Sequence, residues 1–128
     1  MFRRPPPVSG AVTQLAAALR HNPAMAGAVS PFASFADFYP FYLSQHADRT
    51  CRRLHFVGTT LGLLAALHAF STLNFWWLLA GVAAGYAFAW VGHFFFEKNR
   101  PATFTHPVYS FVGDWAMWKD MLTGRIRF

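Results

Sequence analysis

Cysteine and charge are the scarcest features of this sequence. The single cysteine, Cys51, excludes an internal disulfide and any metal site built from paired cysteines. A bound metal is therefore expected to rely on nitrogen and oxygen ligands. Charged residues make up 12% of the 128 residues, and apolar residues make up 55%. Because about 25% of a soluble domain is usually charged, this composition favours a protein of the lipid bilayer.

The net charge of +6 comes from basic residues that lie near segment ends and form no continuous stripe. We therefore expect no nucleic-acid partner, whereas anionic lipid headgroups suit basic residues beside apolar segments. The chain length fits one domain. We expect a flexible N-terminal leader over residues 1–30 and a membrane-embedded helical domain over residues 31–128. The sequence does not indicate an oligomeric state.

The longest run without Asp, Glu, Lys or Arg extends from Leu54 to Phe96. A polar break at residues 71–74 divides it into halves of about 20 residues, the length that an α-helix needs to cross the hydrocarbon core. The pattern predicts a helical hairpin over roughly 51–71 and 75–97. A fully buried hairpin of a soluble protein is the alternative.

Basic residues flank both outer ends of this hairpin. Arg49, Arg52 and Arg53 precede the first span, and Lys98 and Arg100 follow the second. The positive-inside rule places such ends in the cytoplasm. Both hairpin ends are therefore expected on the cytoplasmic side of a membrane, and the membrane we expect is a bacterial inner membrane.

Each predicted span contains two glycines four residues apart, a spacing that lets membrane helices approach closely. The pairs are Gly58 with Gly62 and Gly81 with Gly85. We therefore expect the two spans to pack against each other.

Two further helices complete the predicted fold. One is expected over residues 31–47, with a cap at Ser30 and a kink or fresh start at Pro40. The other is expected over residues 107–122. No strand alternation is visible, so the predicted fold class is all-α: a small integral-membrane helical bundle around a central transmembrane hairpin.

Ionisable side chains recur at one level of the hairpin. His55 and His93 lie almost equally far from the turn, so equal helical rise places them at the same depth near the cytoplasmic end. Glu97 follows His93 by one turn on the same face, and His46 precedes the short loop into the first span. Imidazole and carboxylate groups suit iron, zinc or manganese. The alternative is that these groups bond one another and cap helix ends.

The other polar candidates are less clearly placed. His68 lies near the turn and is expected to be structural, and His21 lies in the leader and is expected to have no role. His106 is either a further ligand or a cap of the last helix. Asp114 either accepts a hydrogen bond from a ligating histidine or pairs with an arginine.

Two aromatic residues, Tyr86 and Trp90, lie on the helical face that leads to His93 and Glu97. They are candidates for lining a channel to an apolar substrate. Plain packing between helices is the alternative.

Three stretches together resemble the 2-hydroxy fatty acid dioxygenase family: YPFYLSQHADRTCRRLHFVGTTLG, GYAFAWVGHFFFEKNRPATF and YSFVGDWAMWKDMLTG. The resemblance covers about residues 35–126. It implies an Fe(II)- and O2-dependent α-oxidation, in which a 2-hydroxy fatty acid gives CO2 and a fatty acid one carbon shorter. The family's histidine motifs fall on His46, His55 and His93, with Glu97 in the last motif, and His106 matches them less well.

The implied substrate has a head that can chelate a metal through its carboxylate and hydroxyl. Arg52, Arg53 or Arg100 could pair with that carboxylate, or bind lipid headgroups instead.

Three other functions remain open at this level. A zinc-dependent membrane lipid hydrolase would use Glu97 as a general base. A helical-hairpin scaffold without enzymatic activity would use its histidines only for internal hydrogen bonds. A haem held between His55 and His93 is the third.

Overall fold

The computed structural model describes residues 10, 14, 17, 21 and 31–128. The chain divides into two units, Met1–Ala33 and Ser34–Phe128, and the second contains the predicted hairpin. The leader predicted over residues 1–30 lies outside the described residues, apart from four positions.

Residues 34–128 are helical and contain no strand, which confirms the predicted all-α class. The elements, in chain order, are α3 (Phe35–Ser44), α4 (Arg49–Thr72), α5 (Trp76–Val91), the π-helix η1 (Gly92–Glu97), the 3-10 helix η2 (Ala102–Phe104) and α6 (Pro107–Leu122).

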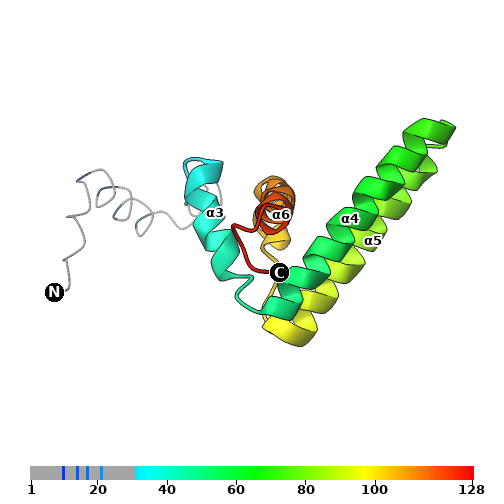
Figure 1. Cartoon of the computed structure of the whole chain (residues 1–128). Coiled ribbons are helices and arrows are strands. Elements are labelled where there is room, and N and C mark those ends of the chain that lie inside the picture. The colour runs from blue at the N-terminus through cyan, green and yellow to red at the C-terminus, as the bar shows by residue number, and fades with distance from the viewer. Residues whose placement is uncertain (1–9, 11–13, 15–16, 18–20, 22–30) are drawn as a thin grey trace. The chain divides into compact units, whose positions relative to one another are not determined.

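The predicted hairpin is confirmed, because α4 and α5 lie side by side and antiparallel along their whole length (Figure 1). The chain reverses at Leu73, which adopts a left-handed conformation with φ of 54°. The two arms follow the expected spans over 51–71 and 75–97 closely.

Glycines explain how closely the two arms approach. A Cβ atom placed on Gly58 would lie 3.0 Å from the carbonyl oxygen of Gly85. A Cβ atom on Gly81 would lie 2.8 Å from the Cβ atom of Ala65. The contact at Gly81 is closer than real Cβ atoms come, and the contact at Gly58 would require a small shift of the other arm. These two glycines therefore let the backbones lie close together.

The sequence predicted that the second arm stays α-helical to residue 97, but the α-helix ends at Val91. The arm widens into the π-helix η1 at Gly92 and ends at Lys98, whose φ is 56°. Gly92 is required at this point because its Cβ atom would lie 3.0 Å from the sulfur of Cys51 on α4. Single π turns often occur at functional sites.

The helix predicted over residues 31–47 is shorter than expected. Residues 31–34 are not helical, and Ser34 caps α3 by accepting the backbone N–H of Asp37 at 3.3 Å. The helix runs through Pro40 and does not start afresh there. The predicted cap, Ser30, lies outside the described residues.

The short helices α3 and α6 pack against each other beside the end of the hairpin where α4 begins (Figure 1). Phe38 and Tyr42 from α3 and Met117 from α6 are fully buried there. Gly113 is necessary for this packing, because its Cβ atom would lie 2.8 Å from the ring of Tyr42. The packing fixes the loop that joins α3 to α4.

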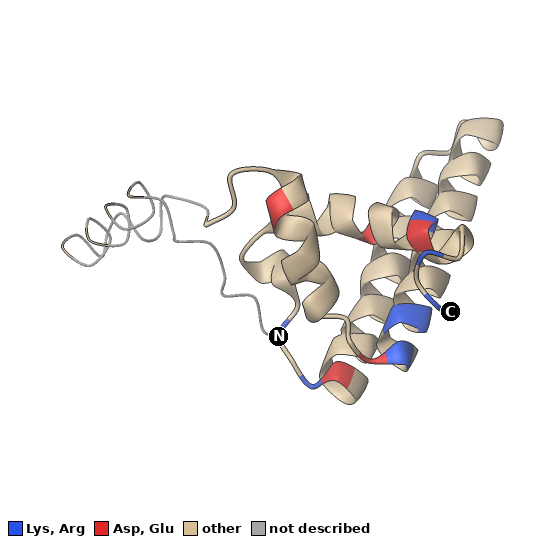
Figure 2. Ribbon diagram, turned by 60° about the vertical axis from the view of Figure 1, so that its left-hand side comes forward, with Lys and Arg blue, Asp and Glu red and all other residues tan. Residues whose placement is uncertain are grey.

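Both arms of the hairpin are long and apolar enough to cross a membrane by length and composition. Only 17% and 22% of their most apolar windows are buried, so they are not the covered core of a soluble domain in this chain. Leu67, Phe70, Trp76 and Leu79 are among the large exposed side chains. Charged residues are absent from the hairpin's turn half (Figure 2).

Adding one methyl group to either of two glycines on α5 tests the hairpin packing. We expect Gly81→Ala to lower the free energy of unfolding by about 1–3 kcal/mol, because the new methyl group overlaps Ala65. Gly85→Ala is the matched control, since its methyl group would meet only the carbonyl group of Gly58, no closer than 3.6 Å. Thermal unfolding in detergent measures both, and equal destabilisation would contradict this packing.

Candidate metal centre

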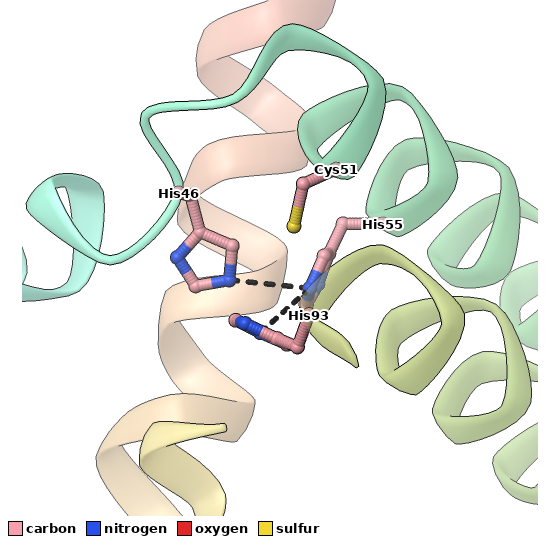
Figure 3. Close-up of side chains that lie close together, drawn as sticks. All are labelled: His46, Cys51, His55 and His93. Carbon is pink, nitrogen blue, oxygen red and sulfur yellow. Dashed lines mark hydrogen bonds between the residues drawn. The ribbon is translucent and has the colours of Figure 1, made fainter. Parts of the chain in front are cut away.

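Four buried side chains converge where α4 begins and α5 ends. His46, Cys51, His55 and His93 each offer one ligand atom, and these atoms all lie within 4.8 Å of one another. Figure 3 shows the three imidazole rings turned toward one another, with the cysteine sulfur beside them. The group could hold a metal ion.

Antiparallel helices bring these residues together from distant positions. Cys51 and His55 lie four residues apart in the first turns of α4, so they share one face. His93 lies in the π turn at the end of the other arm. His46 follows the end of α3 in the short loop before α4.

The three Nε2 atoms form a compact set. The Nε2 atom of His55 lies 3.2 Å from that of His46 and 3.1 Å from that of His93. Two nitrogens bound at right angles to one ion, each at about 2.1 Å, would lie about 3 Å apart. The spacing therefore matches neighbouring positions in the coordination sphere of a single ion.

The other ring nitrogens determine where the protons are. His46 Nδ1 donates to the carbonyl oxygen of Tyr42 at 2.6 Å, because a carbonyl can only accept. His55 Nδ1 lies 3.2 Å from a carboxylate oxygen of Asp114. His93 Nδ1 lies 2.7 Å from the side-chain oxygen of Asn99. Each Nδ1 therefore faces an acceptor outside the cluster.

The three Nε2 atoms consequently face one another. In His46, His55 and His93 the Nδ1 atom has a hydrogen-bond partner outside the cluster, which leaves Nε2 directed inward. A proton on one Nε2 atom makes the short contacts hydrogen bonds. A metal ion between the three atoms can take the place of that proton, so the donor set fits a metal ion.

Burial supports the neutral state of the loop histidine. Burial, followed by the neighbouring His55 imidazole, lowers the pKa of His46 well below its ordinary value. His46 is 1% exposed. Its ring is therefore neutral at pH 7 and available as a ligand.

The orientation of His55 depends on a short chain of hydrogen bonds. Asp114 on α6 accepts from His55 Nδ1 and also from the hydroxyl of Tyr42 on α3. Burial, with the Asp114 charge next, raises the pKa of Tyr42, so the phenol stays protonated and donates. The sequence interpretation of Asp114 offered a histidine partner or an arginine partner, and the structure places it beside the histidine.

Asn99 orients His93 from the other side. Its amide nitrogen donates to the backbone carbonyl of Gln45 at 3.0 Å, so its oxygen faces the His93 ring. This amide connects the π-helical end of the second arm to the residue that precedes His46.

Glu97 does not join the group of four, although it was expected as a ligand. Its two carboxylate oxygens accept the backbone N–H groups of Ala47 at 3.1 Å and Asp48 at 2.6 Å. The π turn changes the angular spacing from His93, so the α-helical i, i+4 argument does not apply. Glu97 instead holds the loop that carries His46.

Arg52 holds the same loop from α4. Its guanidinium donates to the carbonyl oxygens of His46 at 3.1 Å and Ala47 at 2.6 Å. Its Nε atom is buried and has no hydrogen-bond partner. Arg53 and Arg100 lie over the rings of Phe128 and Phe104, at 5.3 Å and 5.6 Å.

The remaining candidates are not members of the group of four. His106 occupies the N-cap position of α6 without a capping side-chain hydrogen bond, and its Nδ1 lies 3.0 Å from the Thr105 hydroxyl. His68 packs edge-on against Trp77 at the turn end of the hairpin. His21 is an exposed helical residue.

The two aromatic residues proposed as a channel pack against each other, with ring centroids of Tyr86 and Trp90 6.1 Å apart. Tyr86 lines a groove that includes His55, whereas Trp90 packs on Phe104.

Sequence reasoning missed three members of this site. The expectation that only nitrogen and oxygen ligands are available is corrected by Cys51, whose position four residues before His55 was the available signal. Tyr42 stands four residues before His46, which makes its carbonyl a natural partner for that ring. Asn99 had no signal beyond being polar near the end of an apolar span.

Removing the charge of Glu97 tests whether this residue holds the loop of His46 or serves as a metal ligand. We expect Glu97→Gln to lower the stability of metal-free protein by about 1–3 kcal/mol, because one of two backbone N–H groups loses its acceptor. Thermal unfolding in the presence of a chelator measures this. A residue that served only as a metal ligand would leave the metal-free protein unchanged.

Comparison with known proteins agrees with this geometry. The family model described as 2-hydroxy-palmitic acid dioxygenase Mpo1-like matches residues 32–126. No curated protein and no solved structure matches the chain. The family match covers most of the chain, including all four residues of the cluster, and it confirms the resemblance seen in the sequence. The chain therefore belongs to the 2-hydroxy-palmitic acid dioxygenase Mpo1-like family.

Proposed function

We propose that this protein catalyses the Fe(II)- and O2-dependent α-oxidation of 2-hydroxy fatty acids at the cluster of His46, His55 and His93. The observation that carries the proposal is the convergence of three Nε2 atoms, with that of His55 3.1–3.2 Å from the other two. The family description supports the substrate class.

The reaction balances without an external reductant. A 2-hydroxy acid and one O2 give a fatty acid one carbon shorter, CO2 and water. The bond between the carboxyl carbon and the hydroxyl-bearing carbon breaks, and O2 receives the four electrons that these carbons lose. No residue of the chain has to change its own oxidation state.

The donor set fits iron in an oxygenase. His46, His55 and His93 would hold the ion through their Nε2 atoms, and nitrogen ligands suit the iron of non-haem oxygenases. Bound Fe(II) would supply the electron-transfer chemistry that makes O2 reactive toward the substrate.

The protein's own residues prepare the site in three ways. Tyr42, Asp114 and Asn99 fix the ring orientations and tautomers, since each contacts a ligating histidine at Nδ1 or orients its partner. Burial keeps bulk water from the histidines. Arg52 places a positive charge beside the His46 loop, and we assign it to the substrate carboxylate because its Nε lacks a partner.

The hairpin suits a substrate that arrives from a bilayer. We propose that both arms cross the membrane, with the histidine cluster near the cytoplasmic face. The arginines of the hairpin's outer ends support that orientation. Arg53 and Arg100, which pack over aromatic rings, are assigned to lipid headgroups.

Histidine variants test the proposal. Anaerobically reconstituted protein is expected to bind about one Fe(II) and to consume O2 when 2-hydroxyhexadecanoic acid is added. We expect His55→Ala and His93→Ala to lose iron and at least 100-fold in turnover, because each removes a convergent nitrogen. His68→Ala is the matched control at the other end of the hairpin. Full activity in both cluster variants would contradict the site.

The Cys51 thiol favours a second candidate, a zinc ion in a site closed by three histidines and one cysteine. The zinc hydrolase considered above has lost its base, because Glu97 faces the loop backbone.

A cysteine variant decides between the two metals. We expect Cys51→Ser to retain bound iron and O2 consumption within about threefold, since three imidazoles remain. Loss of a stoichiometric zinc ion from the variant, with no O2 consumption by either protein, would favour the zinc site. Metal analysis and an oxygen electrode measure the two outcomes.

A further inference from the structure

A groove of about 350 Å³ extends along the hairpin from the histidine cluster toward the turn. It begins at His55 and Asp114 and ends at Ala66 on α4 and Leu78 on α5. Phe111 and Trp115 from α6 form part of its wall, so three helices enclose it. A more open hollow of about 750 Å³ lies at the turn, but no ionisable residue lines it.

Small residues leave this groove empty. The face of α4 that lines it consists of His55, Gly58, Thr59, Gly62 and Ala66, which recur every three or four residues. The opposing face of α5 includes Gly81, Gly85 and Ala89. The larger side chains of α5 that line the groove are Leu78, Val82 and Tyr86.

The glycines of the two helices serve two different purposes. Gly58 and Gly81 serve helix contact, because a Cβ atom would lie 3.0 Å from the Gly85 carbonyl oxygen at Gly58 and 2.8 Å from the Ala65 Cβ atom at Gly81. A Cβ atom on Gly62 would meet only the carbonyl oxygen of Gly81, at 3.6 Å. Helix packing therefore does not require glycine at Gly62, and a side chain there would enter the groove.

The size of the groove suits a long acyl chain. His55 and Ala66 are separated by a helical rise of about 16 Å, and a zigzag chain with bonds of about 1.5 Å advances about 1.3 Å per carbon, which gives about 12 carbons. The volume agrees, since 350 Å³ holds about 12 groups the size of a water molecule, at about 30 Å³ each.

We infer that this groove holds the acyl chain of the 2-hydroxy fatty acid, and that Gly62 and Ala66 set the chain length that the enzyme accepts. The inference rests on the proposed function for the identity of the head group. The groove opens onto His55, so a substrate whose head lies at the cluster would extend its tail past Gly62 and then past Ala66. Apolar walls and the absence of charged groups beyond Asp114 suit methylene groups and no polar ligand.

Two substitutions at different depths of the groove test whether it sets the accepted chain length. Gly62→Leu blocks the groove about 10 Å from the level of His55, and Ala66→Leu blocks it about 16 Å away. We expect the ratio of kcat/KM for 2-hydroxyhexadecanoic acid over 2-hydroxyoctanoic acid to fall at least tenfold in Gly62→Leu. Each variant is expected to lose activity on substrates whose chains reach the blocked level. In Ala66→Leu, this loss is expected to begin at chains about five carbons longer than in Gly62→Leu.

Ala83→Leu is the matched control, because Ala83 is exposed on α5 and does not line the groove. It is expected to keep the wild-type length profile. Should Gly62→Leu fail to fold, Gly62→Ala and Ala66→Leu give the same comparison with smaller changes. Unchanged length profiles in folded variants at both depths would overturn the inference.

A photoreactive 2-hydroxy acid distinguishes this inference from the proposed function. With anaerobic iron-loaded protein in phosphatidylcholine vesicles, a 16-carbon probe with a terminal diazirine is expected to label residues near Ala66 and Leu78. An 8-carbon probe is expected to label nearer Gly58 and Ala89. Labelling spread over the exposed outer face of the hairpin, or groove residues protected by a second copy of the chain, would overturn the inference.

The labelling and turnover results together show which of the two proposals is wrong, the acyl-chain groove or the oxidation. Labelling within the groove by a protein that turns over no 2-hydroxy acid would support the groove and contradict the proposed oxidation. Turnover by a protein that is labelled only outside the groove would support the oxidation and contradict the groove.

Discussion

The structure depends on the convergence of three imidazoles on one point. Their Nε2 atoms face one another, because each Nδ1 atom has a partner in Tyr42, Asp114 or Asn99. These partners come from α3, from α6 and from the segment after η1, so several elements of residues 34–128 contribute to one donor set. A metal ion bound there would therefore stabilise the end of the hairpin where α4 begins.

Both the hairpin and the loop before it position the three histidines. Glycines bring the two arms into backbone contact, and Gly92 lets the end of the second arm approach Cys51. The side chains of Glu97 and Arg52 hold the loop of His46 by hydrogen bonds to its backbone. In the sequence, both looked like residues of the functional site. Glu97 and Arg52 thus position a candidate ligand, His46, and neither belongs to the group of four.

Much of this arrangement could be predicted from sequence because it follows from helical geometry. A charge-free run with one polar break predicts two antiparallel helices, and equal distances from the turn place His55 and His93 together. The same reasoning failed at Glu97, because it assumed α-helical spacing where the chain forms a π turn. It also missed Asn99 and the role of Tyr42, since their hydrogen bonds connect segments whose packing no local pattern reveals.

The most direct test is X-ray absorption spectroscopy at the iron edge of anaerobically reconstituted protein. We expect a first shell of nitrogen and oxygen atoms at about 2.1 Å, with the outer-shell scattering of about three imidazole rings. A spectrum that lacks this outer-shell imidazole scattering would show that the three Nε2 atoms do not share an ion, and would contradict the proposed site.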